Sequence, residues 1–386
     1  MAKISDIKAL KILNSRDDWT IEVELILEDG SCVKASVPEG KSDGSYEAVP
    51  VDVDKAILNI HEEILPALRG LESSDQLALD NKMRELDGTE NKSRLGANAI
   101  LAVSIALVRA SALSSGRPLW KYIREMSRLE SFGATRIYAN LINGGKHAGN
   151  NLDIQEYLII PKTESAKESA DIISHIYHNL GTICVEKYGE SATLVGDEGG
   201  YAPSLDNNLT PLKLIKEASN EFEVDVGIDA AASGIKMSNE KLVEMYREMV
   251  GVYNLFYLED PFSEDDFHAF KGALLEFGEG VKVTGDDLTV TNTDRMRTAK
   301  AQESINGVII KPNQIGTVSE TIEAVRQARK YGWQVVASHR SGETNDSFIA
   351  DFAVGVGADG IKIGAPARGE RIAKYNRLLE IEREDV

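Results

Sequence analysis

The sequence predicts an α/β protein, with a TIM-type (β/α) barrel preceded by an N-terminal α+β capping domain. In the second half, an apolar, β-branched run followed by a reactive side chain recurs about every 23 to 30 residues. This is the length of one strand, one helix and two loops, and repeated units of this kind close into a parallel barrel. The first half instead shows strand patterns followed by a block of helical periodicity. We therefore expect domains at residues 1–133 and 134–386.

The N-terminal domain is expected to contain a small sheet followed by helices. Three strands are predicted, beginning at Ile4 and covering Thr20–Leu27 and Cys32–Val37. Apolar residues at helical spacing follow from Ile57 to Leu68, and Ser73 with Gln76 forms a capping box for the next helix. In the barrel domain, a short strand is expected at Thr193–Val195, and Thr317 with Glu320 forms a second capping box.

Composition and charge exclude several classes of protein. The chain of 386 residues is 42% apolar and 27% charged, with a net charge of −19, which argues against nucleic-acid binding. Its two cysteines and its polar start favour a cytoplasmic protein without a signal peptide. The most apolar stretch, Leu95–Leu113, contains Asn98, Ser104 and Arg109, so we predict a buried helix and no membrane span.

Three carboxylates stand at the ends of consecutive predicted strands. They are Asp229, Glu259 and Asp286. Because the C-terminal ends of barrel strands meet at one mouth, these side chains are expected to converge there. Oxygen ligands of this kind suit Mg²⁺. A cap or loop salt bridge would explain one such acid alone, but three in register favour a metal site.

Cations follow the next strands. Lys311 and Lys362 are each expected inside an otherwise apolar strand, where a buried amine is costly unless its charge is used. Crowding by a second cation lowers the pKa of a lysine and lets it act as a base. The alternative is a solvated strand tip. The run His339-Arg340-Ser341 offers a histidine, a bidentate guanidinium and a hydroxyl, a combination suited to phosphate.

Two more acids lie upstream. Glu198 stands between glycines in 196–200, and Gln155-Glu156 lies in an apolar run. Facing carboxyls can share one proton and so keep a general acid. The glycine-rich segment 144–149 carries His147 and is a candidate lid. Neither GxGxxG nor GxxxxGK[ST] is present, which removes the dinucleotide and P-loop hypotheses.

These motifs resemble the enolase (phosphopyruvate hydratase) family over nearly the whole chain. The most specific blocks are Gly196-Asp197-Glu198-Gly199-Gly200, Glu259-Asp260-Pro261-Phe262, Lys311-Pro312-Asn313-Gln314-Ile315-Gly316-Thr317 and Ser338-His339-Arg340-Ser341-Gly342-Glu343-Thr344. The resemblance implies the family's barrel and Mg²⁺-dependent, reversible dehydration of 2-phosphoglycerate to phosphoenolpyruvate, a step of glycolysis and gluconeogenesis. It also implies a small phosphorylated substrate and an assembly of identical subunits.

The resemblance further implies a role for each matched residue. Lys311 would be the base and Glu198, near Glu156, the acid that protonates the departing hydroxyl. Lys362 would bind the substrate carboxylate and help to lower the pKa of Lys311. The first of two Mg²⁺ ions would be held by Asp229, Glu259 and Asp286, and the second, arriving with substrate, by Ser42. The phosphate and the rest of the substrate would be contacted by Arg340, Ser341, His147, Gln155 and His339.

The loop before the helical block departs from the family pattern. Enolases usually read close to Pro-Ser-Gly-Ala-Ser-Thr-Gly, whereas residues 38–44 keep Ser42 but place acids at Glu39 and Asp43. The span from Asp229 to Glu259 is also short. Three hypotheses therefore stay open: a working enolase, a paralogue acting on a different phosphorylated or phosphonate 2-hydroxy acid, and a non-catalytic binding protein. Racemases and muconate cycloisomerases lack these blocks and fit worse.

Overall fold

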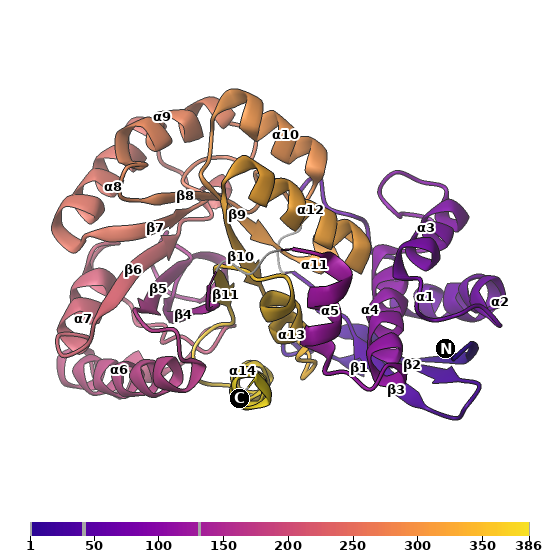
Figure 1. Ribbon diagram of the computed structural model, residues 1–386. Coiled ribbons are helices and arrows are strands. Elements are labelled where there is room, and N and C mark those ends of the chain that lie inside the picture. The colour runs from indigo at the N-terminus through magenta and orange to yellow at the C-terminus, as the bar shows by residue number, and fades with distance from the viewer. Residues whose placement is uncertain (1, 41–43, 130–132, 386) are drawn as a thin grey trace.

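A computed structural model describes residues 2–40, 44–129 and 133–385 (Figure 1). The chain begins with an antiparallel sheet in the order β1-β2-β3. Its strands are β1 (Ile4–Leu13), β2 (Trp19–Leu27) and β3 (Cys32–Ser36). The helices that follow are α1 (Val53–Asn59), α2 (Leu65–Leu68), α3 (Gln76–Asp87), α4 (Ala97–Ser114) and α5 (Leu119–Ser127), with a π-helical turn at Ile60–Ile64 between α1 and α2. The predicted strands and helical block are confirmed.

The apolar helix α4 forms the centre of this first unit. It is the one helix, among the described residues, that is long and apolar enough to cross a membrane, and 83% of that window is buried inside the protein. Its polar members have partners within the fold: Asn98 exchanges hydrogen bonds with the backbone of Val51, and Arg109 pairs with Asp346. The prediction of a buried helix is confirmed.

The expected capping box at the start of α3 was wrong. Asp75 is the N-cap, and its carboxylate accepts a hydrogen bond from the backbone N–H of Ala78 at 3.1 Å. Gln76 is buried, and its amide donates to Asp80 and Ser104. Because buried polar groups need hydrogen-bond partners, the Gln76 side chain bonds to these two residues and does not contribute to a capping box.

The second unit is a closed eight-stranded barrel in the order β10-β11-β4-β5-β6-β7-β8-β9 (Figure 1). Its strands are β4 (Arg136–Asn143), β5 (Glu156–Pro161), β6 (Val224–Asp229), β7 (Leu255–Glu259), β8 (Lys282–Gly285), β9 (Gly307–Ile310), β10 (Gln334–Ser338) and β11 (Gly360–Lys362). The helices are α6 (Ala166–Tyr188), α7 (Thr210–Ala218), α8 (Asn239–Tyr253), α9 (Phe267–Phe277), α10 (Thr293–Gln302), α11 (Pro312–Ile315), α12 (Val318–Tyr331), α13 (Phe348–Gly355) and α14 (Gly369–Asp385). Thr317 is confirmed as the N-cap of α12, since its hydroxyl accepts from the N–H of Glu320. The Glu320 carboxylate accepts from the same hydroxyl and, among the described hydrogen bonds, not from the backbone N–H of Thr317, so the second half of the predicted capping box is not formed.

One barrel strand runs against the others, which corrects the expectation of a wholly parallel barrel. β5 pairs antiparallel with both β4 and β6. Parallel neighbours are usually joined through a helix, but the connection between β4 and β5, residues 144–155, contains only one 3₁₀ turn, Gly145–His147. The start of β5 therefore lies at the same mouth as the ends of its neighbours, and Glu156 stands opposite Asp229.

The N-terminal unit is joined to the barrel mouth by backbone and side-chain contacts. The N–H of Glu39 and that of Gly342 each donate to the other residue's carbonyl at 2.9 Å. Arg109 makes a two-pronged pair with Asp346, with both distances 2.7 Å. The expected boundary between residues 133 and 134 adjoins residues outside the described ranges and stays a prediction.

The strand predicted at Thr193–Val195 was wrong. Residues Glu190–Thr193 form a 3₁₀ turn, and Val195 makes only an isolated bridge with Tyr201. The turn follows directly after α6, since Gly189 is the common cap of both segments. The segment after it leads into the glycine-flanked acid Glu198.

Candidate active site

The three predicted strand-end acids converge at the barrel mouth. Asp229 ends β6 and Glu259 ends β7, paired in register, and Asp286 follows β8 directly. Their exposed fractions are 3%, 0% and 6%. Lys362, at the end of β11, reaches into this group: its Nζ lies 3.0 Å from Asp229 Oδ2 and 2.9 Å from each carboxylate oxygen of Glu259.

The second lysine, Lys311, pairs with the third of these acids. Lys311 follows β9, and its amine pairs with the carboxylate of Asp286. Burial, Arg340 and Lys362 act to lower the pKa of Lys311, but the Asp286 carboxylate outweighs them and the pKa is raised. The sequence analysis predicts a lowered pKa for Lys311, so this prediction was wrong. The pKa of Lys311 is raised because its amine contacts the Asp286 carboxylate directly. A cation bound to Asp286 would weaken this contact and so remove the cause of the raised pKa.

The three acids suit a magnesium ion by ligand type, although their ligand atoms do not all lie within 4.8 Å of one another and Lys362 contacts two of them. Burial and the neighbouring Asp229 raise the pKa of Glu259 to about 8, which shows how strongly this group of acids needs positive charge. All three side chains offer hard carboxylate oxygens, the ligands that Mg²⁺ prefers. Gln314 orients one of them, donating from Nε2 to Asp286 Oδ1 at 2.9 Å.

An acid that the sequence analysis did not select supports this segment. Asp260 is buried with a φ of 40°, and its carboxylate accepts from the backbone N–H groups of Asp286 and Asp287 at 2.9 and 2.7 Å. Oxygens of these three acids lie within 4.8 Å of one another. The sequence does show an acidic residue directly after Glu259, but this position alone does not tell whether the side chain binds a metal or holds the neighbouring backbone.

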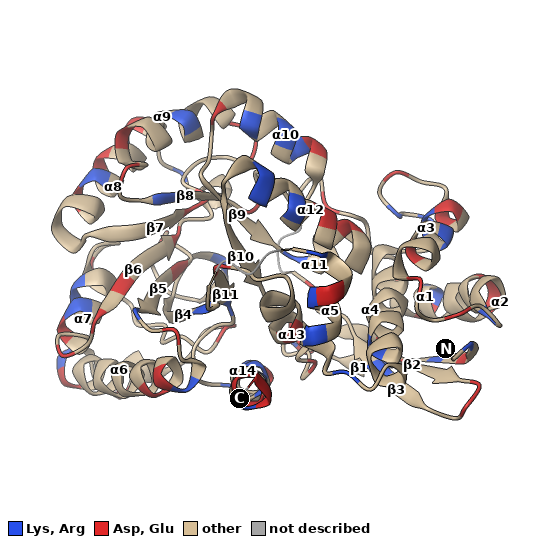
Figure 2. Ribbon diagram, in the orientation of Figure 1, with Lys and Arg blue, Asp and Glu red and all other residues tan. Residues whose placement is uncertain are grey.

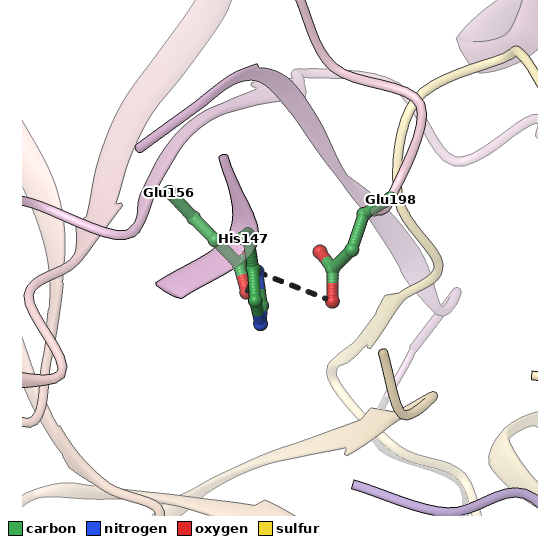
Figure 3. Close-up of side chains that lie close together, drawn as sticks. All are labelled: His147, Glu156 and Glu198. Atoms are coloured by element: carbon green, nitrogen blue, oxygen red, sulfur yellow. Dashed lines mark ion pairs between the residues drawn. The ribbon is translucent and has the colours of Figure 1, made fainter. Parts of the chain in front are cut away.

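Next to this group, a histidine lies between two carboxylates (Figure 3), one of which, Glu156, has its Oε1 3.2 Å from Lys362 Nζ. His147 Nδ1 is 3.7 Å from Glu156 Oε1 and 3.6 Å from Glu198 Oε1. Burial and the Glu198 charge raise the pKa of Glu156 well above its ordinary value. The pKa of Glu198 is instead lowered well below its ordinary value, because His339 and His147 outweigh the effect of burial. The pair can thus hold one proton, and Glu156 is the carboxyl that carries it. His147 is 7% exposed and part of the site, and burial lowers its pKa, so it is neutral there.

The predicted phosphate-binding run follows β10. His339 Nε2 lies 3.3 Å from Glu198 Oε1. Arg340 is buried, and both its terminal nitrogens donate to the carboxylate of Glu47, a residue that the sequence analysis missed. Glu47 has no signal of its own in the sequence because its partner comes from the other domain. Ser341 is buried beside Arg340, and its carbonyl accepts from Ser15 Oγ at 3.1 Å.

These groups surround one cavity of about 50 Å³. The predicted residues that line it are His147, Gln155, Glu156, Glu198, Asp229, Asp286, Lys311, His339, Arg340, Ser341 and Lys362. Glu259 lies behind Lys362 and is fully buried. Ser42 falls outside the described residues. Figure 2 marks the acidic and basic residues along the ribbon, many of which lie on the helices that surround the barrel.

The fold and this site together define a barrel enzyme whose buried acids and lysines can hold a cation and move a proton. Residues 4–123 match the family described as Enolase, N-terminal domain, and residues 137–237 and 233–385 match Enolase, C-terminal TIM barrel domain. The chain belongs to the enolase family.

Full-length relatives agree with this assignment. The chain is 44% identical to enolase of Methanopyrus kandleri, over 99% of this chain and 96% of the relative. It is 42% identical to enolase of Solanum lycopersicum, over 100% of this chain and 96% of the relative. It is also 42% identical to enolase of Methanocaldococcus jannaschii, over 99% of this chain and 95% of the relative.

Proposed function

We propose that the protein catalyses Mg²⁺-dependent, reversible dehydration of 2-phosphoglycerate to phosphoenolpyruvate. One observation carries the proposal: two lysines contact three buried carboxylates at the barrel mouth, and the carboxylate pair Glu156 and Glu198 adjoins them through the contact of Glu156 with Lys362. The reaction needs a base near one face of a carbon and an acid near the leaving hydroxyl. Membership of the enolase family supports the same reaction.

Proton removal is proposed for the lysine side of the site. A proton next to a carboxylate is barely acidic, so its removal needs a base and positive charge on that carboxylate. Lys311 is the proposed base, and Lys362 holds the substrate carboxylate. Mg²⁺ bound by Asp229, Glu259 and Asp286 would supply further positive charge there and would engage the carboxylate that raises the Lys311 pKa.

Loss of the hydroxyl is proposed for the carboxyl pair Glu156 and Glu198. Glu198 gives its proton to the hydroxyl as the carbon–oxygen bond breaks, so that water leaves and a carboxylate remains. Glu156 holds this proton in the resting enzyme and passes it to Glu198, because two buried carboxyls this close carry one proton between them. In the reverse direction, Glu198 takes the proton back from water.

The phosphate end of the substrate is assigned to the segment after β10. Arg340 offers a planar guanidinium and Ser341 a hydroxyl, while His147, Gln155 and His339 line the remaining cavity. A second Mg²⁺ held by the phosphate and Ser42 stays part of the proposal. So do a cytoplasmic location, an assembly of identical subunits, and the absence of nucleic-acid or membrane partners.

The test is an ultraviolet assay for phosphoenolpyruvate with purified protein, 2-phosphoglycerate and Mg²⁺. We expect product to form, and to form in reverse from phosphoenolpyruvate. Other phosphorylated or phosphonate 2-hydroxy acids are run in parallel under identical conditions. If only one of these turned over, the paralogue hypothesis would replace the proposal. If neither 2-phosphoglycerate nor any of these acids turned over, the binding-protein hypothesis would replace the proposal.

A further inference from the structure

A buried arginine outside the proposed catalytic set contacts the segment that follows β10. Arg371 lies in the first turn of α14 and is 0% exposed. Its Nη1 lies 2.6 Å from His339 Nδ1 and 2.7 Å from the carbonyl of Arg340. Its Nη2 donates to the carbonyl of Ser341 at 2.7 Å and to that of Asp197 at 3.2 Å.

The contact with His339 fixes where the imidazole carries its proton. A guanidinium has only donors and is not deprotonated in proteins. The ring nitrogen facing Arg371 must therefore accept, which leaves Nδ1 without a proton. A neutral imidazole with a bare Nδ1 carries its hydrogen on Nε2.

The protonated Nε2 lies close to the proposed general acid, at ion-pair distance and without an aligned hydrogen bond. His339 Nε2 lies 3.3 Å from Glu198 Oε1, and Asn140 Nδ2 donates to the other oxygen, Oε2, at 3.1 Å. Donors aimed at a carboxylate stabilise its charged form. Glu198 becomes charged when it gives its proton to the departing hydroxyl, so both donors act on the state that the reaction creates.

We propose that Arg371 is a positioning residue that holds His339 as the tautomer protonated at Nε2, so that His339 stabilises the Glu198 carboxylate during hydroxyl loss. The catalytic part of this inference rests on the proposed function, but the tautomer does not. A purely structural role for Arg371 is the competing explanation, because the same guanidinium ties together the carbonyls of three residues.

The tautomer is tested directly by nitrogen NMR of protein labelled with ¹⁵N-histidine. The chain has 6 histidines, and the His339 signals are assigned by their loss in His339→Gln. We expect the wild type to show an acceptor Nδ1 and a protonated Nε2. Arg371→Met should mix the tautomers or reverse them. A wild-type ring protonated at Nδ1, or an unchanged tautomer in Arg371→Met, would overturn the proposal.

Arg368→Met is the matched control. Arg368 is a nearby arginine that also binds backbone carbonyls, those of Ser15 and Gly196. Because it does not contact His339 through any described hydrogen bond, its loss should leave the tautomer as in the wild type. A tautomer change in this control as well would assign the effect to general loosening of the loops.

The catalytic part is tested with two substitutions of His339. Glutamine places an amide N–H near the Nε2 position, whereas asparagine reaches only the Nδ1 position. We expect His339→Gln to keep dehydration within roughly tenfold of the wild type and His339→Asn to lose roughly a hundredfold, the range for one hydrogen bond to a charged group. Both should still exchange the substrate α-proton with solvent, because that step precedes the need for Glu198.

The possible failures are distinguishable. Equal losses of dehydration in the two His339 variants, or a parallel loss of exchange, would refute the stabilising role while wild-type dehydration of 2-phosphoglycerate stood. A wild type with no such activity would refute the proposed function, and the NMR result would still decide the tautomer. If Arg371→Met does not fold, the wild-type tautomer and the His339 pair still give a decision.

Discussion

The carboxylate of Glu47, from the N-terminal domain, holds the guanidinium of Arg340, from the barrel. Nη1 lies 2.8 Å from Oε2 and Nη2 lies 3.2 Å from Oε1, with the side chains only 4% and 5% exposed. Gln314 extends the contact, since its Nε2 lies 3.4 Å from Glu47 Oε1 and 2.9 Å from Asp286 Oδ1. Arg340, which is proposed to bind phosphate, is thus linked to Asp286, which is proposed to bind the metal, through Glu47 of the other domain and Gln314.

This pair predicts a large stability change on Glu47→Gln. Removing one partner of a buried ion pair leaves the other charge uncompensated, which costs about 3 kcal/mol or more. We expect the free energy of unfolding, measured in urea, to fall by about that amount. Glu22→Gln is the control, because Glu22 pairs with Lys34 at the surface and should cost about 1 kcal/mol or less.

Inorganic phosphate supplies a second readout of the same variant. An anion bound at Arg340 would compensate its charge, so phosphate should raise the melting temperature of Glu47→Gln more than that of the wild type. Equal increases would mean that Arg340 is not the phosphate contact, whatever the cost in stability.

Magnesium dependence is the next prediction. With excess chelator, dehydration of 2-phosphoglycerate should stop, and added Mg²⁺ should restore it, because three buried carboxylates supply the oxygen ligands. Asp286→Asn should weaken Mg²⁺ binding in calorimetry without substrate present. Full turnover in chelator would refute the metal assignment, and unchanged binding in Asp286→Asn would remove that residue from it.

The roles of Lys311 and Glu198 are separable by isotope exchange. If Lys311 is the base, Lys311→Ala should lose both turnover and exchange of the substrate α-proton with deuterium. Glu198→Gln should lose dehydration but keep exchange, because proton removal precedes hydroxyl loss. The measurement is proton NMR of 2-phosphoglycerate in heavy water. Exchange that persisted in Lys311→Ala would show that another group is the base.

Stability should fall in acid because His339 is buried as a neutral ring. Burial lowers the pKa of His339 to about 4, despite the opposing charge of Glu198 and with Arg371 adding to the decrease. The unfolded chain then binds more protons than the folded one between about pH 6.5 and 4, so the free energy of unfolding falls as pH falls through this window. We expect a loss of about 2 kcal/mol between pH 7 and 5 that is missing in His339→Gln. The same slope in both proteins would contradict this.

The barrel and most of its site could be predicted because strand periodicity fixes which side chains reach the mouth. Asp229, Glu259 and Lys362 stand at strand ends for that reason. The reversed direction of β5 could not be read from its apolar pattern, since a buried strand looks the same in either direction. Only the connection from β4, which contains no helix beyond one 3₁₀ turn, carried that information.

Contacts between residues that are far apart in the chain could not be predicted from the sequence either. Glu47 and Arg371 gain their roles from what they contact, and each contact joins residues that no local pattern relates. The raised pKa of Lys311 has the same origin. Its sign depends on whether Asp286 or Lys362 is the nearer charge, which only the folded geometry decides.

The unusual acids at Glu39 and Asp43 give the last prediction. Glu39 lies beside Gly342, and the next residue, Gly40, packs against the guanidinium of Arg340, whereas Asp43 is outside the described residues. Two unit charges at 4 Å and a surface-like dielectric interact by about 4 kcal/mol before screening, and by less when solvated.

Even about 1 kcal/mol of net repulsion of a phosphorylated substrate costs about fivefold in affinity. We therefore expect Glu39→Ser with Asp43→Thr to lower KM for 2-phosphoglycerate, by an amount that shrinks as salt rises. The serine keeps the backbone pairing with Gly342, which needs no side chain. Glu28→Ser with Asp29→Thr removes the same charge from a distant exposed turn and should leave KM unchanged. A higher KM in the first double variant would show that its acids assist binding, and the paralogue hypothesis would then gain over a plain enolase.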